Sequence, residues 1–333
     1  MTTILGARNW ESGNSMLNSV DMSTNVTAST TFKKTGAYAL KLGSGITTPW
    51  ARFALAGTPA TPSVSAWIYM TGNFDTSGTA TTHNVSFRTT DGYLIAARWN
   101  GNTHTFDAYV NNVLFKAGTV EVSQNDWFHV QFYATIADAG NITILIDGHE
   151  SVNQNGDTMP GANNAVDYLY LYQGSLVIAT YVDNLVWGSG GLLGDLRPYV
   201  KVPAADTAVK QWTPSTSNVN WTMEEDVPPN DTQYNTAATD GLADEFALAA
   251  LNITGLICVG VVPWARARMT DGVGCSLKVG VNSGGTVSTK TSALSTTWQY
   301  YWGNVDEVDP ADSAAWDQTK LNALLSRKEA VIP

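Results

Sequence analysis

Short runs in which apolar and polar residues alternate recur along most of the chain. Runs of about 4–8 residues with this alternation are typical of half-buried strands. Asn-Gly, Asp-Gly and Asn-Asn pairs between the runs suit tight hairpin turns. The pattern therefore predicts an all-β chain. Its expected strands in the first half are residues 64–70, 84–89, 93–99, 105–110, 113–116, 128–136, 141–146, 168–172 and 181–187.

A glycine-rich segment interrupts this pattern after residue 187. Residues 188–194 read Gly-Ser-Gly-Gly-Leu-Leu-Gly, and Pro198 follows. Glycine and proline at this density are typical of linkers. We therefore expect a first domain over residues 1–188, a linker over 189–198 and a second domain over 199–333.

The second domain has fewer regular runs. Strands are predicted at 246–248, 256–269 and 275–281, with the last two joined by residues 270–274. Residues 316–328 are predicted to form the only helix, because four apolar residues there share one helical face.

The composition narrows the classes of partner. Charged residues make up 14% of the chain and the net charge is −11, with no basic cluster in either half. Phosphate binding needs clustered lysine and arginine, so we expect no nucleic-acid partner. No apolar run approaches membrane-spanning length and the first residues resemble no signal peptide, so we expect no membrane insertion and no secretion signal. Cys258 and Cys275 are expected to be buried free thiols.

Four segments of the first half, in the right order, resemble laminin-G and concanavalin-A-type jelly-roll domains. They are residues 36–42, 64–68, 126–148 and 181–187. The most specific segment contains Trp127-Phe128-His129-Val130 and then Ile142-Thr143-Ile144-Leu145-Ile146-Asp147-Gly148, which is similar to two neighbouring strands and a turn of that family. The resemblance implies a jelly-roll sandwich over residues 1–188, with Trp67 packed in its core.

Parts of the second half resemble a module of tailed-bacteriophage structural proteins that often follows a laminin-G-like domain. They are residues 194–198, 211–215, 226–231, 246–248, 264–268 and 298–301. This resemblance implies a virion subunit that assembles in the host cytoplasm and is exposed on the capsid or the tail. Its second domain would be a β-sandwich with a short C-terminal helix. Its partners would be other virion subunits, including copies of itself, and a host-surface glycan.

Catalytic residues are not predicted. Retaining glycosidases need two carboxylates about 5–5.5 Å apart, and glucan-cleaving jelly rolls carry them in a Glu-x-Asp-x-x-Glu pattern that this chain lacks. Glu121, Glu150 and Glu224 lie in separate segments. No Gly-x-Ser-x-Gly motif occurs, and the four histidines have no zinc-ligand spacing. We therefore expect that the chain is not an enzyme.

Calcium is the one ion that the family resemblance suggests. Jelly rolls of this type often bind one calcium ion where the opening segment meets the closing strand, through hard oxygen ligands. Glu11 and Asp183 occupy the corresponding positions. A solvated Glu11 and a strand-capping Asp183 are the alternative interpretation.

A sugar-binding site would combine exposed aromatic rings with amide donors. Trp99 next to Asn100 and Asn102, together with Tyr170 in the run Tyr168, Tyr170 and Tyr172, fits this description. Core packing and subunit contacts are alternative roles for these rings. The chain is therefore interpreted as a non-enzymatic virion structural protein, with a carbohydrate-binding lectin-like module and a polysaccharide-degrading enzyme as alternatives.

Overall fold

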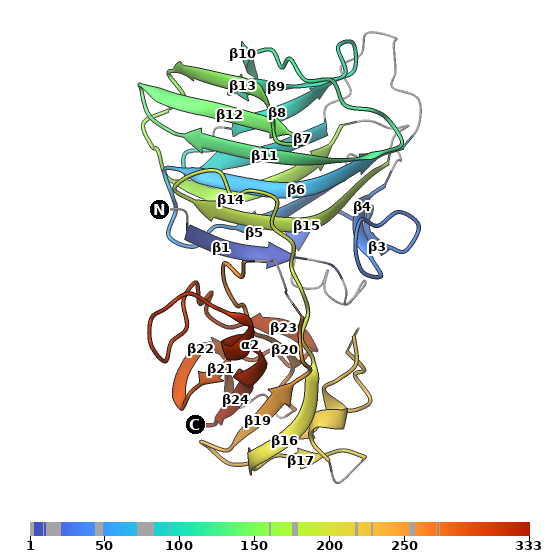
Figure 1. The fold of residues 1–333 in the computed structure, drawn as a ribbon, viewed down its shortest axis with the longest axis vertical. Coiled ribbons are helices and arrows are strands. Elements are labelled where there is room, and N and C mark those ends of the chain that lie inside the picture. Colours follow the sequence, from blue (N-terminus) through green and yellow to red (C-terminus); the bar gives the residue numbers. More distant parts are fainter. Residues whose placement is uncertain are drawn as a thin grey trace. The chain divides into compact units, whose positions relative to one another are not determined.

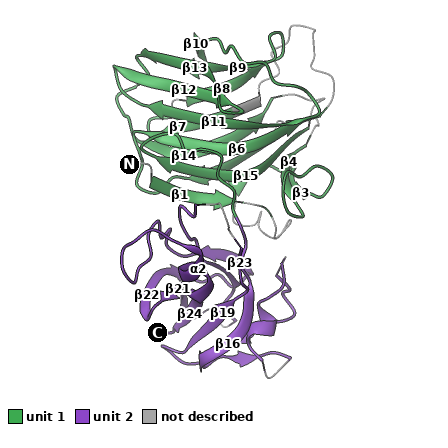
Figure 2. Cartoon of the chain, viewed as in Figure 1, with its two compact units in different colours: residues 1–198 green, residues 199–333 purple. Residues whose placement is uncertain are grey.

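A computed structural model describes residues 3–8, 10, 21–43, 49–71, 83–92, 94–159, 161–174, 179–216, 219–227, 229–252, 257–270, 272 and 274–333. The chain divides into two compact units, residues 1–198 and residues 199–333 (Figure 2). In both units the regular secondary structure is almost all antiparallel strand, which confirms the predicted all-β class. Among the residues described, no helix has the length and apolar character needed to cross a membrane.

Unit 1 is a sandwich of two antiparallel sheets, as expected for a jelly roll (Figure 1). The eight-stranded sheet has the order β13-β12-β11-β6-β15-β4-β3, with β1 also paired to β15. Its strands are β1 (Thr3–Arg8), β3 (Val26–Ser29), β4 (Ala39–Leu42), β6 (Pro62–Met70), β11 (Trp127–Thr135), β12 (Gly140–Ile146), β13 (His149–Gly156) and β15 (Thr180–Ser189).

The seven-stranded sheet has the order β10-β9-β8-β7-β14-β5-β2. Its strands are β2 (Asp21–Met22), β5 (Trp50–Ala54), β7 (His83–Thr89), β8 (Leu94–Asn100), β9 (Thr105–Val110), β10 (Val113–Lys116) and β14 (Val166–Gln173).

The core of unit 1 lies between these two sheets. Successive side chains of a strand point to opposite faces, so every second residue of each central strand is directed inward. Phe87 on β7 and Phe132 on β11 are both fully buried, and their rings stack across the sandwich with centroids 4.8 Å apart. Stacked aromatic pairs of this kind add stabilisation beyond the area that they bury. This packing fixes which residues of each sheet face outward.

Residues 190–198, called the strap below, pack against the outward face of the eight-stranded sheet. The Gly194 amide donates to Gln131 Oε1 at 2.8 Å, and the Gly194 carbonyl accepts from Ser65 Oγ at 2.7 Å. Trp67 Nε1 donates to Asp195 Oδ1 at 2.9 Å. The expected linker is therefore hydrogen-bonded to unit 1 along part of its length. The expectation that Trp67 packs in the core is wrong, because its ring lies on the face that the strap contacts.

Unit 2 contains a five-stranded antiparallel sheet of order β16-β19-β24-β21-β22 and two short ribbons, β17-β18 and β20-β23. Its elements are β16 (Pro203–Lys210), β17 (Thr213–Pro214), the 3-10 helix η1 (Trp221–Met223), β18 (Asn235–Thr236), β19 (Ala243–Leu248), β20 (Trp264–Ala267), β21 (Ser276–Ser283), β22 (Thr286–Ala293), β23 (Gln299–Trp302), α2 (Gln318–Ala323) and β24 (Leu325–Val331).

Two predictions for unit 2 need correction. The helix ends at Ala323, and β24, which follows it, is the central strand of the five-stranded sheet. Hydrogen bonding to strands on both sides overrides the helix propensity of this segment. The strand expected over 256–269 is also shorter than predicted, because its described residues form only β20, from Trp264 to Ala267, which pairs with β23.

Candidate ligand-binding face

The outward face of the seven-stranded sheet carries a group of arginine and aromatic side chains. Strand alternation places them there, since the residues between them, such as Phe53, Phe87 and Leu171, are buried in the core. We call this group the Arg–Tyr face. It comprises Trp50 and Arg52 of β5, Ser86 and Arg88 of β7, Arg98 of β8, Tyr109 of β9, and Tyr168, Tyr170 and Tyr172 of β14.

Tyr170 lies at the centre of this face. It is paired with Arg52 on one side and with Ser86 on the other. The Tyr170 hydroxyl accepts a hydrogen bond from Arg52 Nη1 at 3.2 Å and one from Arg88 Nη1 at 3.5 Å. Two guanidinium groups from strands on opposite sides of β14 therefore converge on one phenol oxygen.

The arginines also lie over the aromatic rings. The Arg52 guanidinium carbon is 4.7 Å from the centroid of Tyr168, and that of Arg98 is 4.6 Å from the centroid of Tyr109. Cation–π contacts at these distances hold a guanidinium in place while leaving N–H groups available for a ligand. The hydrogen bonds to Tyr170 and then to Asp21 raise the pKa of Arg52, whereas burial lowers that of Arg98.

Two carboxylates of the described part of the chain lie on the same face, and both have partners. Asp21 forms an ion pair with Arg52. Asp107 is 1% exposed and accepts from Asn100 Nδ2 at 2.8 Å, from Thr105 Oγ1 at 3.0 Å and from the Gly118 amide at 2.8 Å. The exposed part of the face is therefore dominated by positive charge and aromatic surface, in a chain whose net charge is −11.

The predicted sugar-binding residues divide between this face and other places. Tyr170 lies at its centre, and Asn100 lies on the same face but positions Asp107. Asn102 lies in the turn after β8, where its amide donates to Asn100 Oδ1 at 3.1 Å. The expectation of an exposed ring at Trp99 is wrong. Trp99 is 1% exposed, because it points into the core and packs against His104 and Phe106, each with a centroid distance of 5.8 Å.

Sequence reasoning missed six residues of the face: Trp50, Arg52, Ser86, Arg88, Arg98 and Tyr109. The signal was present, since Arg52 and Arg88 alternate with core residues as Tyr170 does. What could not be read from the sequence was the strand order β8-β7-β14-β5, which brings these segments together.

The structure describes only one of the two calcium ligands that the resemblance suggested. Glu11 lies outside the described residues. Asp183 is buried, and its Oδ2 accepts from the amides of Lys34 and Thr35 at 2.9 Å each, while Oδ1 accepts from the Asn184 amide at 2.7 Å. No group of three or more His, Cys, Asp or Glu side chains suited to a metal occurs in the part of the chain that the structure describes. Calcium binding therefore stays a prediction.

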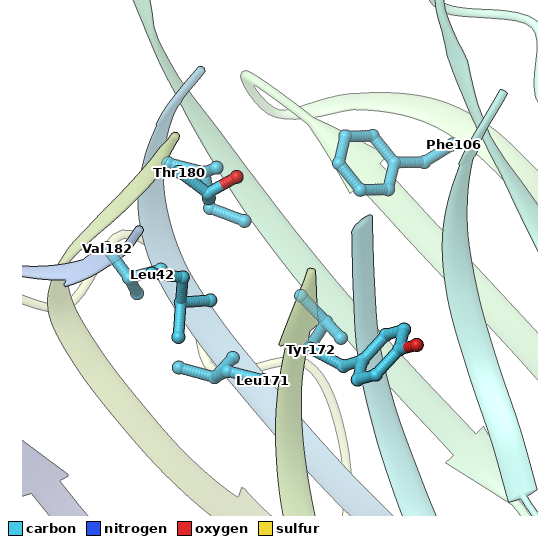
Figure 3. Close-up of a pocket in the computed structure, with 8 residues that line it drawn as sticks. Leu42, Phe106, Leu171, Tyr172, Thr180 and Val182 are labelled. Atoms are coloured by element: carbon cyan, nitrogen blue, oxygen red, sulfur yellow. The ribbon is translucent and has the colours of Figure 1, made fainter. Parts of the chain in front are cut away.

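A small pocket opens between the two sheets of unit 1 (Figure 3). Its cavity volume is about 10 Å³, which is roughly the space that one water molecule needs. The lining residues are Leu42, Ile68, Val85, Phe106, Leu171, Tyr172, Thr180 and Val182. A void of this size in the core cannot hold a sugar ring, so the candidate site is the open Arg–Tyr face.

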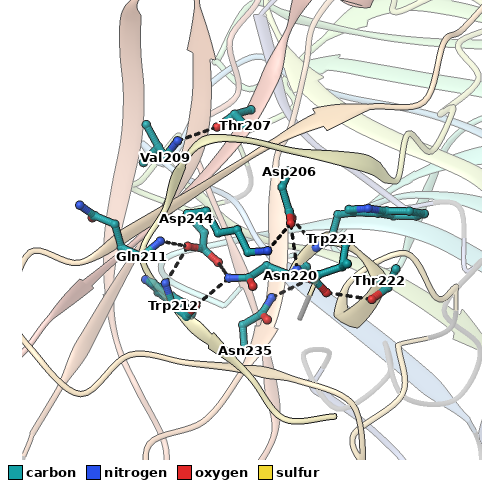
Figure 4. Close-up of polar contacts among 12 residues, drawn as sticks. Asp206, Thr207, Val209, Gln211, Trp212, Asn220, Trp221, Thr222, Asn235 and Asp244 are labelled. Atoms are coloured by element: carbon teal, nitrogen blue, oxygen red, sulfur yellow. Dashed lines mark hydrogen bonds and ion pairs between the residues drawn. The ribbon is translucent and has the colours of Figure 1, made fainter. Parts of the chain in front are cut away.

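Unit 2 has a buried polar cluster of its own, centred on Asp244 (Figure 4). Asp244 Oδ1 accepts from the amides of Gln211 and Trp212 at 2.7 and 2.8 Å, and Oδ2 accepts from Asn220 Nδ2 at 2.6 Å. Asp206 accepts from the amides of Asn220 and Trp221 at 3.1 and 2.7 Å. These contacts fix the segment before η1 against the five-stranded sheet. Cys258 and Cys275 are free, as expected, but are only partly buried.

Comparison with known proteins does not identify a family. No protein-family model matches the sequence, and no curated protein matches it. Among solved structures, the chain is similar to the cellulose-induced protein Cip1, with 12% identity, 58% of this chain and 98% of that chain covered, and a TM-score of 0.42.

Two other solved structures are also similar to the chain. One is domain 4 of AbnA, an extracellular arabinanase of Geobacillus stearothermophilus in complex with arabinotriose, with 15% identity, 58% and 95% coverage and a TM-score of 0.41. The other is a conserved carbohydrate esterase of Shiga toxin-encoding bacteriophage phi24B, with 14% identity, 57% and 100% coverage and a TM-score of 0.42. Likenesses at these identities and TM-scores carry no argument about function.

Proposed function

We propose that the chain is a non-enzymatic carbohydrate-binding subunit whose jelly roll binds an acidic polysaccharide through the Arg–Tyr face. One observation carries this proposal: three guanidinium groups and four tyrosine rings lie on one sheet face of an acidic chain. Among the residues that the structure describes, the exposed acidic side chain on that face is Asp21, which pairs with Arg52.

An acidic sugar fits this chemistry better than a neutral one. A hexuronic acid residue presents a carboxylate and an apolar ring face within one unit. Guanidinium groups bind carboxylates through paired charge-assisted hydrogen bonds, and aromatic rings offer flat apolar surface to the sugar. The arginines belong to strands β5, β7 and β8, which span about 15 Å across the sheet at the usual strand spacing. The face would therefore contact successive residues of a polymer.

Hydrolysis is not part of this proposal. Asp21 on β2 and Asp107 on β9 are separated by four intervening strands, so their backbones lie about 24 Å apart. A retaining mechanism needs about 5–5.5 Å and an inverting mechanism about 6.5–9.5 Å between carboxyl groups. Asp21 and Asp107 are therefore too far apart to act together in either mechanism of glycoside hydrolysis.

We assign unit 2 the role of binding other subunits in the assembly of a bacteriophage particle. The resemblance of residues 194–231 to phage structural modules supports this setting. So does the exposure of large apolar side chains, since exposed apolar groups favour protein–protein contact. Seven of the ten most exposed large apolar residues described are in unit 2: Tyr199, Val227, Tyr234, Ile257, Val259, Val287 and Val308. Labelling of intact particles with an antibody against residues 1–188 tests the setting, and unlabelled particles would contradict it.

An array of acidic and neutral glycans tests the binding function. The wild-type chain should bind hexuronate polymers, and a variant carrying both Arg52→Ala and Arg88→Ala should not. Binding of neutral glycans alone, or equal binding by the double variant, would contradict the proposal. Incubation with the bound polymer should leave its chain length unchanged. Shortened polymer would show that the face catalyses cleavage and would refute the non-enzymatic part.

A further inference from the structure

A lysine, a carboxylate and a carboxamide meet in unit 2, where Lys328 is buried and Glu224 and Asn235 are partly buried. Lys328 lies on the central strand β24 and is 9% exposed. Its Nζ contacts Glu224 Oε2, and the ammonium lies 5.5 Å from the centroid of Phe246. Glu224 Oε1, the other oxygen of the same carboxylate, accepts from Asn235 Nδ2 at 3.2 Å. One carboxylate thus bridges an amine and an amide.

In the described part of the chain, only one of the two polar atoms in the Asn235 side-chain amide makes hydrogen bonds. Its Nδ2 also donates to the Asn220 carbonyl at 3.0 Å (Figure 4). Its Oδ1 is buried and has no hydrogen-bond partner among the described residues. A buried carbonyl oxygen without a donor is costly, and this oxygen can still accept a hydrogen bond as negative charge develops on it when Cγ is attacked.

The amine is also unusual for a lysine. Burial lowers the pKa of Lys328 to about 7, while the negative charge of Glu224 acts in the opposite direction. A lysine whose proton can move to an adjacent carboxylate is a competent nucleophile near neutral pH. Nucleophile, acid–base group and carbonyl are therefore held together by the fold, which is the condition for an effectively unimolecular reaction.

We propose that Lys328 and Asn235 form an intramolecular isopeptide bond, with Glu224 as the acid–base catalyst. Glu224 accepts a proton from the Lys328 amine, and Nζ attacks Cγ of Asn235. The carboxyl then protonates Nδ2 as the Cγ–Nδ2 bond breaks, and ammonia leaves. One C–N bond forms and one breaks, so no oxidant or co-reactant is required. The product is a secondary amide between the two side chains.

The position of the bond gives it a structural effect. Asn235 begins β18, which pairs with β17 in a two-stranded ribbon. Lys328 lies at the centre of the five-stranded sheet, between β19 and β21. The cross-link would attach the ribbon covalently to the sheet and close a loop on the order of 90 residues, a length at which covalent closure strongly restricts the unfolded chain. Unit 2 would then resist unfolding under load or heat.

Mass spectrometry of the purified full chain tests the proposal. Loss of ammonia should make the intact mass about 17 Da lower than the sequence mass. Trypsin does not cleave after an acylated lysine, so residues 211–266 and 328–333 should be recovered as one linked peptide. The variants Lys328→Arg, Asn235→Ala and Glu224→Gln should each have the full sequence mass. Lys278→Arg, on the neighbouring strand but on the opposite sheet face, should keep the deficit.

Three results of the mass measurements would overturn the proposal. A wild-type chain with its full mass and with normal cleavage after Lys328 would refute it. A deficit that persists in Lys328→Arg would reflect cyclised asparagine elsewhere and would also refute it. A deficit of about 18 Da with Lys328 joined to Glu224 would reject Asn235 as the acyl group. If the bond forms, Asn235→Ala should lower the melting temperature of unit 2 by on the order of 10 °C.

Discussion

Arg52 on β5 and Tyr170 on β14 are direct cross-strand neighbours, and the guanidinium donates to the phenol oxygen at 3.2 Å. Arg88 approaches the same oxygen from β7. This arrangement fixes two cations around a half-exposed ring at the centre of a sheet face. It is the feature on which the proposed carbohydrate binding depends.

Arg88 provides the cleanest test of the charge on this face, because its side chain is exposed and has no ion-pair partner among those described. Arg88→Ala should weaken binding of a hexuronate oligosaccharide by about 10- to 100-fold, since a charge-assisted hydrogen bond contributes about 1.5–3 kcal/mol. Titration calorimetry measures the change. Lys116→Ala, an exposed cation on β10 of the same sheet, is the control. An equal loss in both variants would indicate only a general charge effect.

The variant Tyr170→Phe distinguishes the contribution of the hydroxyl to binding from that of the ring. The variant keeps the aromatic surface but removes the oxygen that Arg52 and Arg88 share, so both guanidinium groups lose their common anchor. Affinity for the acidic oligosaccharide should fall about 3–10-fold, and the free energy of unfolding should change by less than about 1 kcal/mol. Tyr133→Phe, whose hydroxyl contacts Thr135 on the other sheet, should bind normally. Unchanged binding by Tyr170→Phe would exclude the hydroxyl from the site.

Trp99 should affect stability and not ligand recognition directly. Its side chain is 1% exposed and packs against Phe106 in the core. Trp99→Ala should reduce the free energy of unfolding by about 3–5 kcal/mol, because it leaves a large cavity. Urea unfolding measures this loss. A Trp99→Ala chain that unfolds like the wild type and yet fails to bind the glycan would mean that the ring contacts ligand.

The strap should make unit 1 sensitive to acid. His129 is buried beneath it, and its Nε2 lies 2.8 Å from Ser65 Oγ. Burial lowers the pKa of His129 below its ordinary value of 6.5, and the charges of Asp195 and Asp147 oppose this only in part. The unfolded chain therefore binds this proton more readily. The resulting stability is present above about pH 6.5 and is lost as the pH falls through the lower pKa of the folded state.

Urea unfolding at pH 7.5 and pH 5.0 tests this dependence. The wild-type chain should lose more stability between the two pH values than His129→Gln, in which residue 129 does not titrate. The comparison between variants cancels the contribution of the other acidic groups. Equal losses in both proteins would show that His129 is not responsible.

Nine strands of unit 1 were predicted because their apolar and polar residues alternate clearly, whereas β1, β2, β3, β5 and β13 were not predicted. Where that contrast is absent, the prediction failed. β22 (Thr286–Ala293) consists mostly of Thr, Ser and Lys, and its residues are exposed or half-buried on both faces, so no period is visible. β24 (Leu325–Val331) contains Leu, Arg, Lys, Glu and Ala, which favour helix, and only pairing with β19 and β21 makes it a strand.

The candidate site was predictable only in part. Tyr168, Tyr170 and Tyr172 share a face by alternation alone. The same rule gives Trp99 the opposite orientation to Arg98 and Asn100, but the adjacent Asn-Gly turn favoured an exposed ring there. Arg52 and Arg88 join the site only because β14 lies between β5 and β7, and strand order is set by packing of the whole sandwich.

The central claim is that the Arg–Tyr face recognises the carboxylates of a polysaccharide. It is tested most directly by titrating the full chain with a hexuronate oligosaccharide and with the same oligosaccharide after its carboxyl groups have been reduced to alcohols. The two ligands keep the same linkages and ring surfaces and differ in charge. We predict that the chain binds the acidic oligosaccharide at least about 10-fold more tightly. Equal affinity for both ligands, or binding of neither, would contradict the account.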